Sequence, residues 1–207
     1  MNSGVIGLAH PQRGHFDLGT GFHGDLWLDL DALFLRPSLL RPHMRLLADR
    51  LREHRVDAVC GPMEGGALLA LAIADTLGVA FLPAYRAPEQ RTNAYRLPDV
   101  RGGTGGTGGT GGTGGIAGIA GWRVAIADDA VNAGTAVRAC AGLLRSRGAV
   151  PVAVAALLSL GPAAAVVAGA VSVPLYAAGT VQSQAWPADR CPLCAGDVPF
   201  TEPLPPG

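Results

Sequence analysis

Two adjacent carboxylates, followed closely by a Gly-Thr pair, are the residues of this sequence with the clearest chemistry. Asp128 and Asp129 come directly after the apolar run 124–127, and Gly134 and Thr135 follow a few residues later. Two carboxylates can accept hydrogen bonds from a pair of vicinal hydroxyls or bind Mg²⁺. The Thr135 hydroxyl and the N–H groups at the start of a helix would suit a phosphate. Together these residues predict a site for a ribose 5-phosphate.

The elements that must position these residues follow from the hydrophobic pattern. Residues 124–127 predict a buried strand and residues 135–147 a helix, with the short loop between them. Strands that alternate with helices predict an α/β fold with a doubly wound parallel sheet flanked by helices, in which ligands bind at the carboxyl ends of the strands. The other expected strands are 56–60, 79–83, 151–158 and 174–178, and the other expected helices are 42–54, with Pro42 in its first turn, and 67–77.

Composition limits the possible functions. The 207 residues are 49% hydrophobic and 15% charged, which fits a single globular domain over residues 1–207. Its 16 basic residues, all Arg, balance 16 acidic ones, so we expect no nucleic-acid-binding surface.

The N-terminus lacks a signal-peptide pattern, and the longest apolar stretch, 67–74, is too short to span a bilayer. Four Cys make no disulfide framework in a chain of this size, and we expect a cytoplasmic protein without a membrane partner.

Three segments lie outside the alternating pattern. Residues 15–30 predict short strands and turns that form a small flap, and residues 185–207 form a C-terminal tail. Residues 102–115 repeat Gly-Gly-Thr and hold no apolar side chain to bury, so they predict a flexible loop within the domain.

Residues 124–136 resemble the signature of the type I phosphoribosyltransferases, which is an apolar strand, two acidic residues and a loop that closes on Gly-Thr. The resemblance implies displacement of pyrophosphate from phosphoribosyl pyrophosphate (PRPP) by a ring nitrogen, with Mg²⁺ as cofactor. It assigns the ribose hydroxyls to Asp128 and Asp129, which would then be catalytic. It assigns the rest of the PRPP contacts to Ala130, Val131, Asn132, Ala133, Gly134, Thr135 and Ala136.

Three further segments resemble the orotate phosphoribosyltransferases. In residues 14–27, His23 matches a Lys or His that lies close to the base, and Asn132 stands where a Thr usually faces the base. The pair Cys191 and Cys194 resembles a C-terminal tail of many bacterial members. Residues 61–66 follow a strand as that family's pyrophosphate-binding loop does, which implies PRPP contacts for Glu64, Gly65 and Gly66.

This closer resemblance implies a homodimer that converts orotate and PRPP into orotidine 5′-monophosphate and pyrophosphate, a step of pyrimidine biosynthesis. Positive charge would grow on the ribose and negative charge on the leaving pyrophosphate as the glycosidic bond breaks. Cations and oriented N–H groups around the leaving group would lower that barrier.

The sequence departs from the family pattern after residues 79–83, where an Arg-Lys pair and a second Lys are usual. Arg86 matches the Arg, which implies a catalytic role on the pyrophosphate, but the two Lys positions hold Ala87 and Gln90. The charge could come instead from a neighbouring Arg at position 91, 96 or 101, although a guanidinium does not replace an ammonium at a tight site. Residues 159–162 also lack the Arg that often contacts orotate. Two alternatives stay open, a phosphoribosyltransferase for another base and a non-catalytic PRPP sensor.

The remaining candidates have structural interpretations. Cys191 and Cys194 have the spacing of a zinc knuckle, but zinc needs four ligands and no second pair is evident, so we expect a metal-free turn. Trp27 and Trp186 are expected to pack rather than to stack on a base.

A deletion tests the interpretation of the Gly/Thr repeat. Removing residues 105–113 should leave the melting temperature and the PRPP affinity unchanged, because halving a flexible loop changes its closure entropy by only about 0.6 kcal/mol. Thermal unfolding and calorimetric PRPP titration measure both quantities. A large loss of either would show that the repeat has a structural or capping role.

Overall fold

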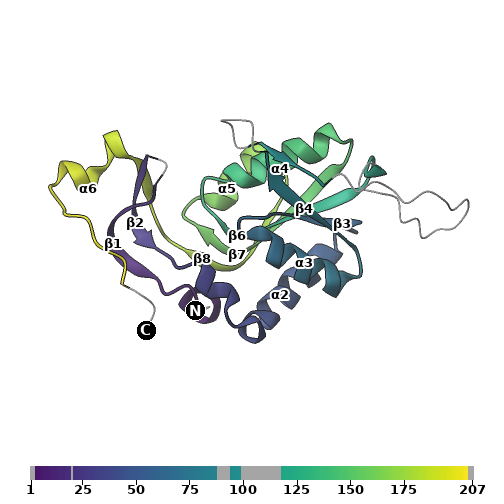
Figure 1. Cartoon of the computed structure of the whole chain (residues 1–207), viewed down its shortest axis with the longest axis horizontal. Helices are drawn as coiled ribbons and strands as arrows, with labels where there is room; N and C mark the ends of the chain where they lie inside the picture. The colour runs from purple at the N-terminus through teal and green to yellow at the C-terminus, as the bar shows by residue number, and fades with distance from the viewer. Residues whose placement is uncertain (1–2, 20, 88–93, 99–117, 205–207) are drawn as a thin grey trace, which may run out of the picture.

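Five parallel strands form the centre of the computed structural model, which describes residues 3–19, 21–87, 94–98 and 118–204 (Figure 1). The sheet order is β5-β4-β3-β6-β7-β8, and only β5 runs antiparallel to its neighbour. This arrangement confirms the predicted α/β fold with a doubly wound parallel sheet. The strands are β3 (Ala58–Pro62), β4 (Ala80–Arg86), β5 (Tyr95–Arg96), β6 (Arg123–Val131), β7 (Val150–Leu160) and β8 (Leu175–Val181).

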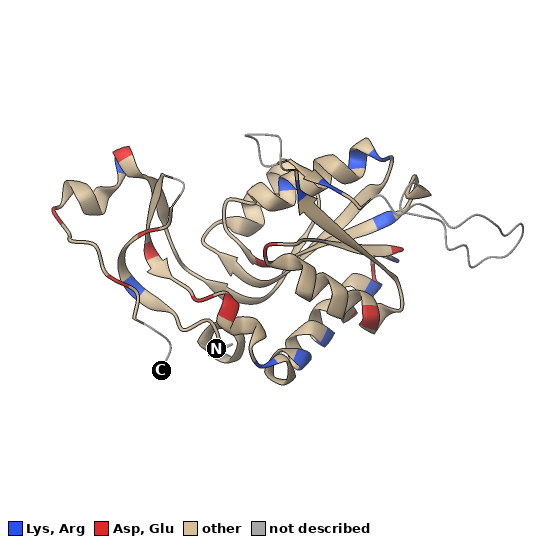
Figure 2. Cartoon of the chain, in the orientation of Figure 1, with Lys and Arg blue, Asp and Glu red and all other residues tan. Residues whose placement is uncertain are grey.

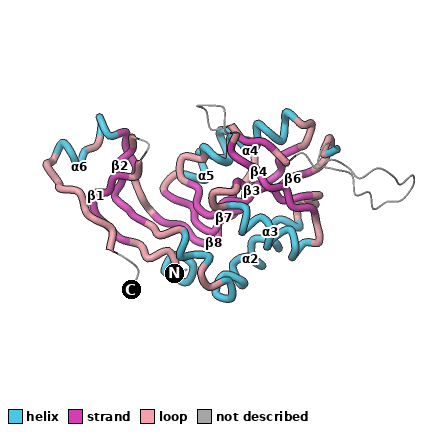
Figure 3. The backbone as a smooth tube through the Cα atoms, viewed as in Figure 1, coloured by secondary structure: helices cyan, strands magenta, loops and turns pink. Residues whose placement is uncertain are grey.

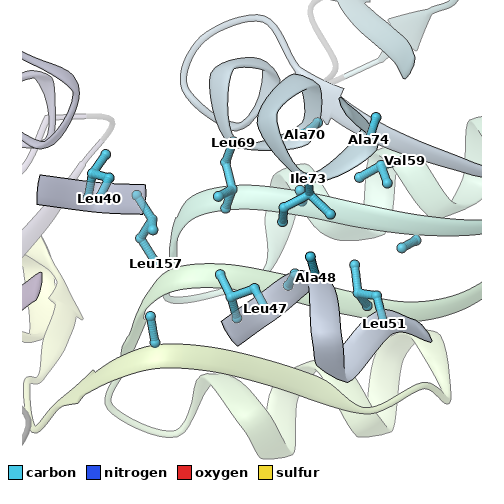
Figure 4. Packing of buried hydrophobic residues seen from close by; sticks show 14 of the residues in the cluster. Leu40, Leu47, Ala48, Leu51, Val59, Leu69, Ala70, Ile73, Ala74 and Leu157 are labelled. Carbon is cyan, nitrogen blue, oxygen red and sulfur yellow. The ribbon is translucent and has the colours of Figure 1, made fainter. Parts of the chain in front are cut away.

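Helices cover both faces of this sheet because alternate side chains of the central strands are apolar on both sides. On β6, Ala125 and Ala127 pack into the cluster formed with α2 and α3, whereas Val124 and Ile126 pack into the cluster formed with α4 and α5. Figure 4 shows the first cluster, with leucines of α2 against α3 and the sheet. The helices are α1 (Ser3–Gly7), α2 (Pro37–Arg52), α3 (Gly66–Leu77), α4 (Thr135–Ser146) and α5 (Ala163–Val171).

Helix α2 begins earlier than the sequence predicts. Pro37, not Pro42, occupies the first turn, and Pro42 lies inside the helix. Pro42 has no N–H to donate within the helix. The buried stripe of Leu40, Leu47 and Leu51 against the sheet compensates for that loss. The predicted start at Pro42 was therefore wrong, while the predicted helix 67–77 is confirmed by α3.

A second, three-stranded antiparallel sheet lies beside the main sheet (Figure 3). It joins β1 (Gln12–Asp17) and β2 (Phe22–Trp27) to β9 (Ala185–Pro187), so the predicted flap and the C-terminal tail form one lobe. The described residues also form two short 3₁₀ helices, η1 (Asp31–Phe34) and η3 (Ala188–Arg190), and the one-turn helix α6 (Pro192–Ala195).

Charged residues are interspersed along the ribbon of both lobes (Figure 2). Among the described residues, no helix is long and apolar enough to cross a membrane. The Gly/Thr repeat 102–115 and the residues Gln90, Arg91 and Arg101 lie outside the part of the chain that the structure describes.

Candidate active site

The two carboxylates lie within the last part of β6. The strand continues to Val131, and Asp128 pairs with Ala156 of β7, so the predicted strand end at residue 127 was too early. Helix α4 begins at Thr135, after Gly134 in the left-handed conformation with φ of 65°. Glycine adopts this conformation at no steric cost, which lets the chain turn sharply from strand to helix. The predicted order of strand, loop and helix N-terminus is thus present.

Asp128 and Asp129 form an acidic pair in which Asp128 is buried and Asp129 is half-buried. Asp128 is only 7% exposed, and its Oδ1 accepts a hydrogen bond from the Asp129 N–H at 3.2 Å. Burial, followed by repulsion from the Asp129 charge, raises the pKa of Asp128 well above its ordinary value. Burial also raises the pKa of Asp129, although its Oδ1 accepts a bond from the Ala130 N–H at 2.6 Å. Two desolvated carboxylates favour a ligand that brings hydroxyl donors or a cation.

The raised pKa of Asp128 leads to a prediction about the thermal stability of the protein. A raised pKa means that ionisation of Asp128 lowers the stability of the folded protein in full above that pKa. The cost falls as the pH drops below it and is lost near the ordinary pKa, where the unfolded carboxyl is protonated too. Asp128→Asn removes the charge and keeps the shape. We therefore expect this variant to melt a few degrees higher than the parent at about pH 8, since about 1 kcal/mol shifts Tm by roughly 2–4 °C in a domain of this size.

Thermal unfolding across a pH series measures the difference between the two proteins. The gap in Tm should close as the pH falls toward the ordinary pKa of an aspartate. A variant that melts at or below the parent at every pH would contradict a cost of ionised Asp128.

Two glycines bring the expected pyrophosphate loop against this acidic pair. A Cβ on Gly65 would overlap the Asp129 carboxylate, and a Cβ on Gly66 would overlap the backbone of β6 at Ala127. Only glycine allows these close approaches. The loop after β3 therefore meets the last part of β6 at the carboxyl edge of the sheet, where open α/β sheets bind ligands.

Glu64 and Arg86 connect this loop to β4. Arg86 Nε donates to Glu64 Oε1 at 2.8 Å, and Tyr95 of β5 donates its hydroxyl proton to Glu64 Oε2 at 2.9 Å. Partial burial acts to raise the pKa of Glu64, but the bonds from Arg86 and Tyr95 outweigh burial and set this pKa below its ordinary value. Glu64 is thus held ionised, and Arg86 is held beside the loop that Gly65 and Gly66 form.

A cavity of about 550 Å³ adjoins the loop after β6. Asn132, Ala133 and Thr135 line one side of it, and the lobe of β1, β2 and β9 lines the other. Much of that second wall is apolar and includes Leu18, Phe22 and Trp186. Asp128 and Asp129 do not line the cavity themselves, but Asn132 on its wall follows Asp129 by three residues. Trp186, expected only to pack, is part of this wall.

His23 is not among the residues that line this cavity. Its neighbour Phe22 lines the wall, and successive side chains of a strand point to opposite faces. His23 instead lies 3.2 Å from Cys194 Sγ, measured from its Nδ1. The structure therefore does not bring His23 together with Asn132, the other residue expected to face the base.

One residue at the loop was missed from the sequence. Arg138 of α4 donates from Nη1 to the Ala133 carbonyl at 2.7 Å, and its Nη2 lies 3.4 Å from Thr135 Oγ1. Its guanidinium thus fixes the loop and adds positive charge beside the helix N-terminus. The signal was its position three residues after Thr135, on the same face of the helix.

Sequence similarity to known proteins identifies the family of this chain. No profile of a known protein family matches the chain. An orotate phosphoribosyltransferase of Carboxydothermus hydrogenoformans is 30% identical over 195 residues, which cover 92% of this chain and 89% of that protein. The chain belongs to the orotate phosphoribosyltransferase family. A second orotate phosphoribosyltransferase, from Caldanaerobacter subterraneus subsp. tengcongensis, is 28% identical over 193 residues, or 92% of this chain and 88% of that protein.

Solved structures show the same fold. The crystal structure of orotate phosphoribosyltransferase from Aeropyrum pernix has a TM-score of 0.62 and 21% identity, covering 85% of this chain and 89% of that one. An adenine phosphoribosyltransferase from Thermoanaerobacter pseudethanolicus has a TM-score of 0.64 and 16% identity, covering 86% and 98%. The predicted phosphoribosyltransferase fold is therefore confirmed, and it is shared by enzymes named for different bases.

Proposed function

We propose that this protein transfers ribose 5-phosphate from PRPP to orotate, which gives orotidine 5′-monophosphate and pyrophosphate. The observation that carries the proposal is the meeting of Asp129 on β6 with Gly65 in the loop after β3. One loop would bind the ribose diol and 5-phosphate, and the other would bind the pyrophosphate. Membership of the orotate phosphoribosyltransferase family supports orotate as the base.

Each group has a defined part in this reaction. Asp128 and Asp129 would accept hydrogen bonds from the ribose hydroxyls and stabilise positive charge that grows on the sugar. The N–H groups from Asn132 to Ala136 and the Thr135 hydroxyl would bind the 5-phosphate at the start of α4. Arg86 would stabilise negative charge on the departing pyrophosphate.

The acidic pair also fits a divalent cation, because hard carboxylate oxygens are the ligands that Mg²⁺ prefers. Mg²⁺ bound there with PRPP would neutralise pyrophosphate charge. We also propose a cytoplasmic homodimer, as the family resemblance implies, and sedimentation analysis measures the oligomeric state.

Two alternative functions are favoured by the cavity wall and by positions 87 and 90. The cavity's described lining contains no Lys or Arg to pair with the orotate carboxylate, and the Lys positions 87 and 90 hold Ala and Gln. These features favour either a phosphoribosyltransferase for an uncharged base or a PRPP sensor that does not turn over.

One experiment separates these candidates. Pyrophosphate release is measured with PRPP, Mg²⁺ and orotate, uracil or a purine base in turn, while calorimetry measures PRPP binding alone. The proposal expects release with orotate. Release with another base alone would establish the second enzyme, and binding without release for any base would establish the sensor.

A further inference from the structure

Four metal-binding side chains converge in the small lobe, away from the acidic pair. His15 lies on β1 and His23 on β2, while Cys191 directly precedes the one-turn helix α6 and Cys194 lies within it. One potential ligand atom from each lies within 4.8 Å of all the others. In Figure 1 this is the lobe that carries the labels β1, β2 and α6.

The spacing of these atoms matches a tetrahedral site. His15 Nε2 lies 3.4 Å from His23 Nδ1, 3.5 Å from Cys191 Sγ and 3.6 Å from Cys194 Sγ, and His23 Nδ1 lies 3.2 Å from Cys194 Sγ. With ordinary Zn–N and Zn–S bond lengths, a tetrahedral zinc separates two nitrogens by about 3.3 Å and a nitrogen from a sulfur by about 3.5 Å. These four of the six pairwise distances therefore lie close to those that one central ion requires.

Hydrogen bonding leaves the correct nitrogen of His15 available. Its Nδ1 lies 2.7 Å from the Val198 carbonyl, which can only accept, so Nδ1 carries the proton. Nε2 then holds a lone pair that is aimed at the three other ligand atoms. A single lone pair cannot accept hydrogen bonds from all three. A histidine that donates its second N–H to a carbonyl is the usual arrangement around a bound metal.

The surrounding chain holds this geometry in place. His15 is 1% exposed and Cys191 is 3% exposed. The Thr201 N–H donates to the His15 carbonyl at 2.7 Å, and the ring of Phe200 lies 4.2 Å from that of His15. The tail after α6 therefore folds back over the two imidazoles, and burial excludes water from one side of the cluster.

We propose that His15, His23, Cys191 and Cys194 bind one Zn²⁺ as a structural site. Two sulfurs and two imidazole nitrogens in tetrahedral arrangement are typical of zinc. Both thiols lose a proton to solvent on binding, so the site has two thiolates and two neutral imidazoles. The proposal replaces the expectation of a metal-free turn at the two cysteines, and it does not depend on the proposed enzymatic function.

The consequence for the molecule is a cross-link between segments that lie far apart in the sequence. Zinc would join the β1–β2 hairpin to the C-terminal tail and so fix β2, whose Phe22 forms part of the cavity wall. All four ligands come from the small lobe, so this site gives a structural function to the Cys-Pro-Leu-Cys motif.

Metal analysis of the full-length protein tests the site. Protein purified under reducing conditions without added chelator should contain about one zinc ion per chain. After zinc removal, Co²⁺ titration should give the visible absorption of a tetrahedral centre and a thiolate-to-cobalt charge-transfer band. Neither measurement requires a variant that folds.

A pair of double variants localises the metal. Cys191→Ala with Cys194→Ala should lose the zinc and the cobalt bands. Cys60→Ala with Cys140→Ala removes the two core thiols and should keep both signals. His15→Ala should abolish the tetrahedral spectrum. Parent protein without zinc and without cobalt bands, a Cys191–Cys194 disulfide under reducing conditions, or zinc retained by the Cys191/Cys194 variant would each overturn the proposal.

Discussion

Replacing Asp128 and Asp129 together with Asn should weaken PRPP binding by about 2–4 kcal/mol, which is roughly 30- to 1,000-fold in affinity. The change keeps the shape of both side chains and removes the charge that strengthens hydrogen bonds from the ribose hydroxyls. The effect is expected to be large because Asp128 is buried and its charge is little screened by water. Calorimetric titration with PRPP and Mg²⁺ measures it.

The control carries the same change in net charge at exposed positions. Asp49→Asn with Asp189→Asn alters two carboxylates whose side chains are 70% and 81% exposed, far from the acidic pair in sequence. This control should bind PRPP like the parent. An unchanged PRPP affinity in the Asp128/Asp129 variant, with its fold intact by circular dichroism, would show that the ribose binds elsewhere.

Arg86→Ala should lower kcat by roughly 10²–10³, the scale of removing one oriented donor to a developing anion. The PRPP dissociation constant should change much less, because the negative charge on the leaving pyrophosphate grows as the bond breaks. The structure supports this position through the 2.8 Å bond from Arg86 to Glu64 in the loop that meets Asp129. Single-turnover rates, measured with a base that reacts, separate the chemical step from binding.

Two further variants identify how Arg86 acts. Arg52→Ala removes an arginine of nearly equal exposure, 56% against 55%, on the far helix α2 and should leave kcat unchanged. Tyr95→Phe removes the other hydrogen bond to Glu64. An equal loss of kcat in Tyr95→Phe would mean that Arg86 acts only by placing Glu64. An intact kcat in Arg86→Ala would exclude Arg86 from the chemistry.

The sheet and the phosphate loop could be predicted from the sequence because their signals are local. Apolar runs fix the strands, and Asp128, Asp129, Gly134 and Thr135 stand within eight residues of each other, so that their order alone implies the turn. Pro42 misled the prediction, since its preference for a first turn is weaker than the burial of Leu40 two residues earlier.

The ligand cluster of the small lobe could not be predicted in the same way. His15 and Cys191 are 176 residues apart in sequence, and their contact depends on β9 pairing with β2. Only the two cysteines have the sequence spacing of a zinc knuckle. The two histidines lie on separate strands of a hairpin, and their sequence spacing does not indicate a metal site. Similarly, the link from Tyr95 to Glu64 arises from the pairing of β5 with β4, which is a two-residue ladder with no clear pattern of its own.

The pairing of β2 with β9 also affects the order in which the chain can fold during synthesis. The β1–β2 hairpin leaves the ribosome before the strands of the parallel sheet, but its third strand, at residues 185–187, emerges only after them. An isolated two-stranded hairpin is only marginally stable in water. The parallel sheet from β3 to β8 is complete in sequence before residue 185, so it can form first, and the lobe that closes over the cavity matures last.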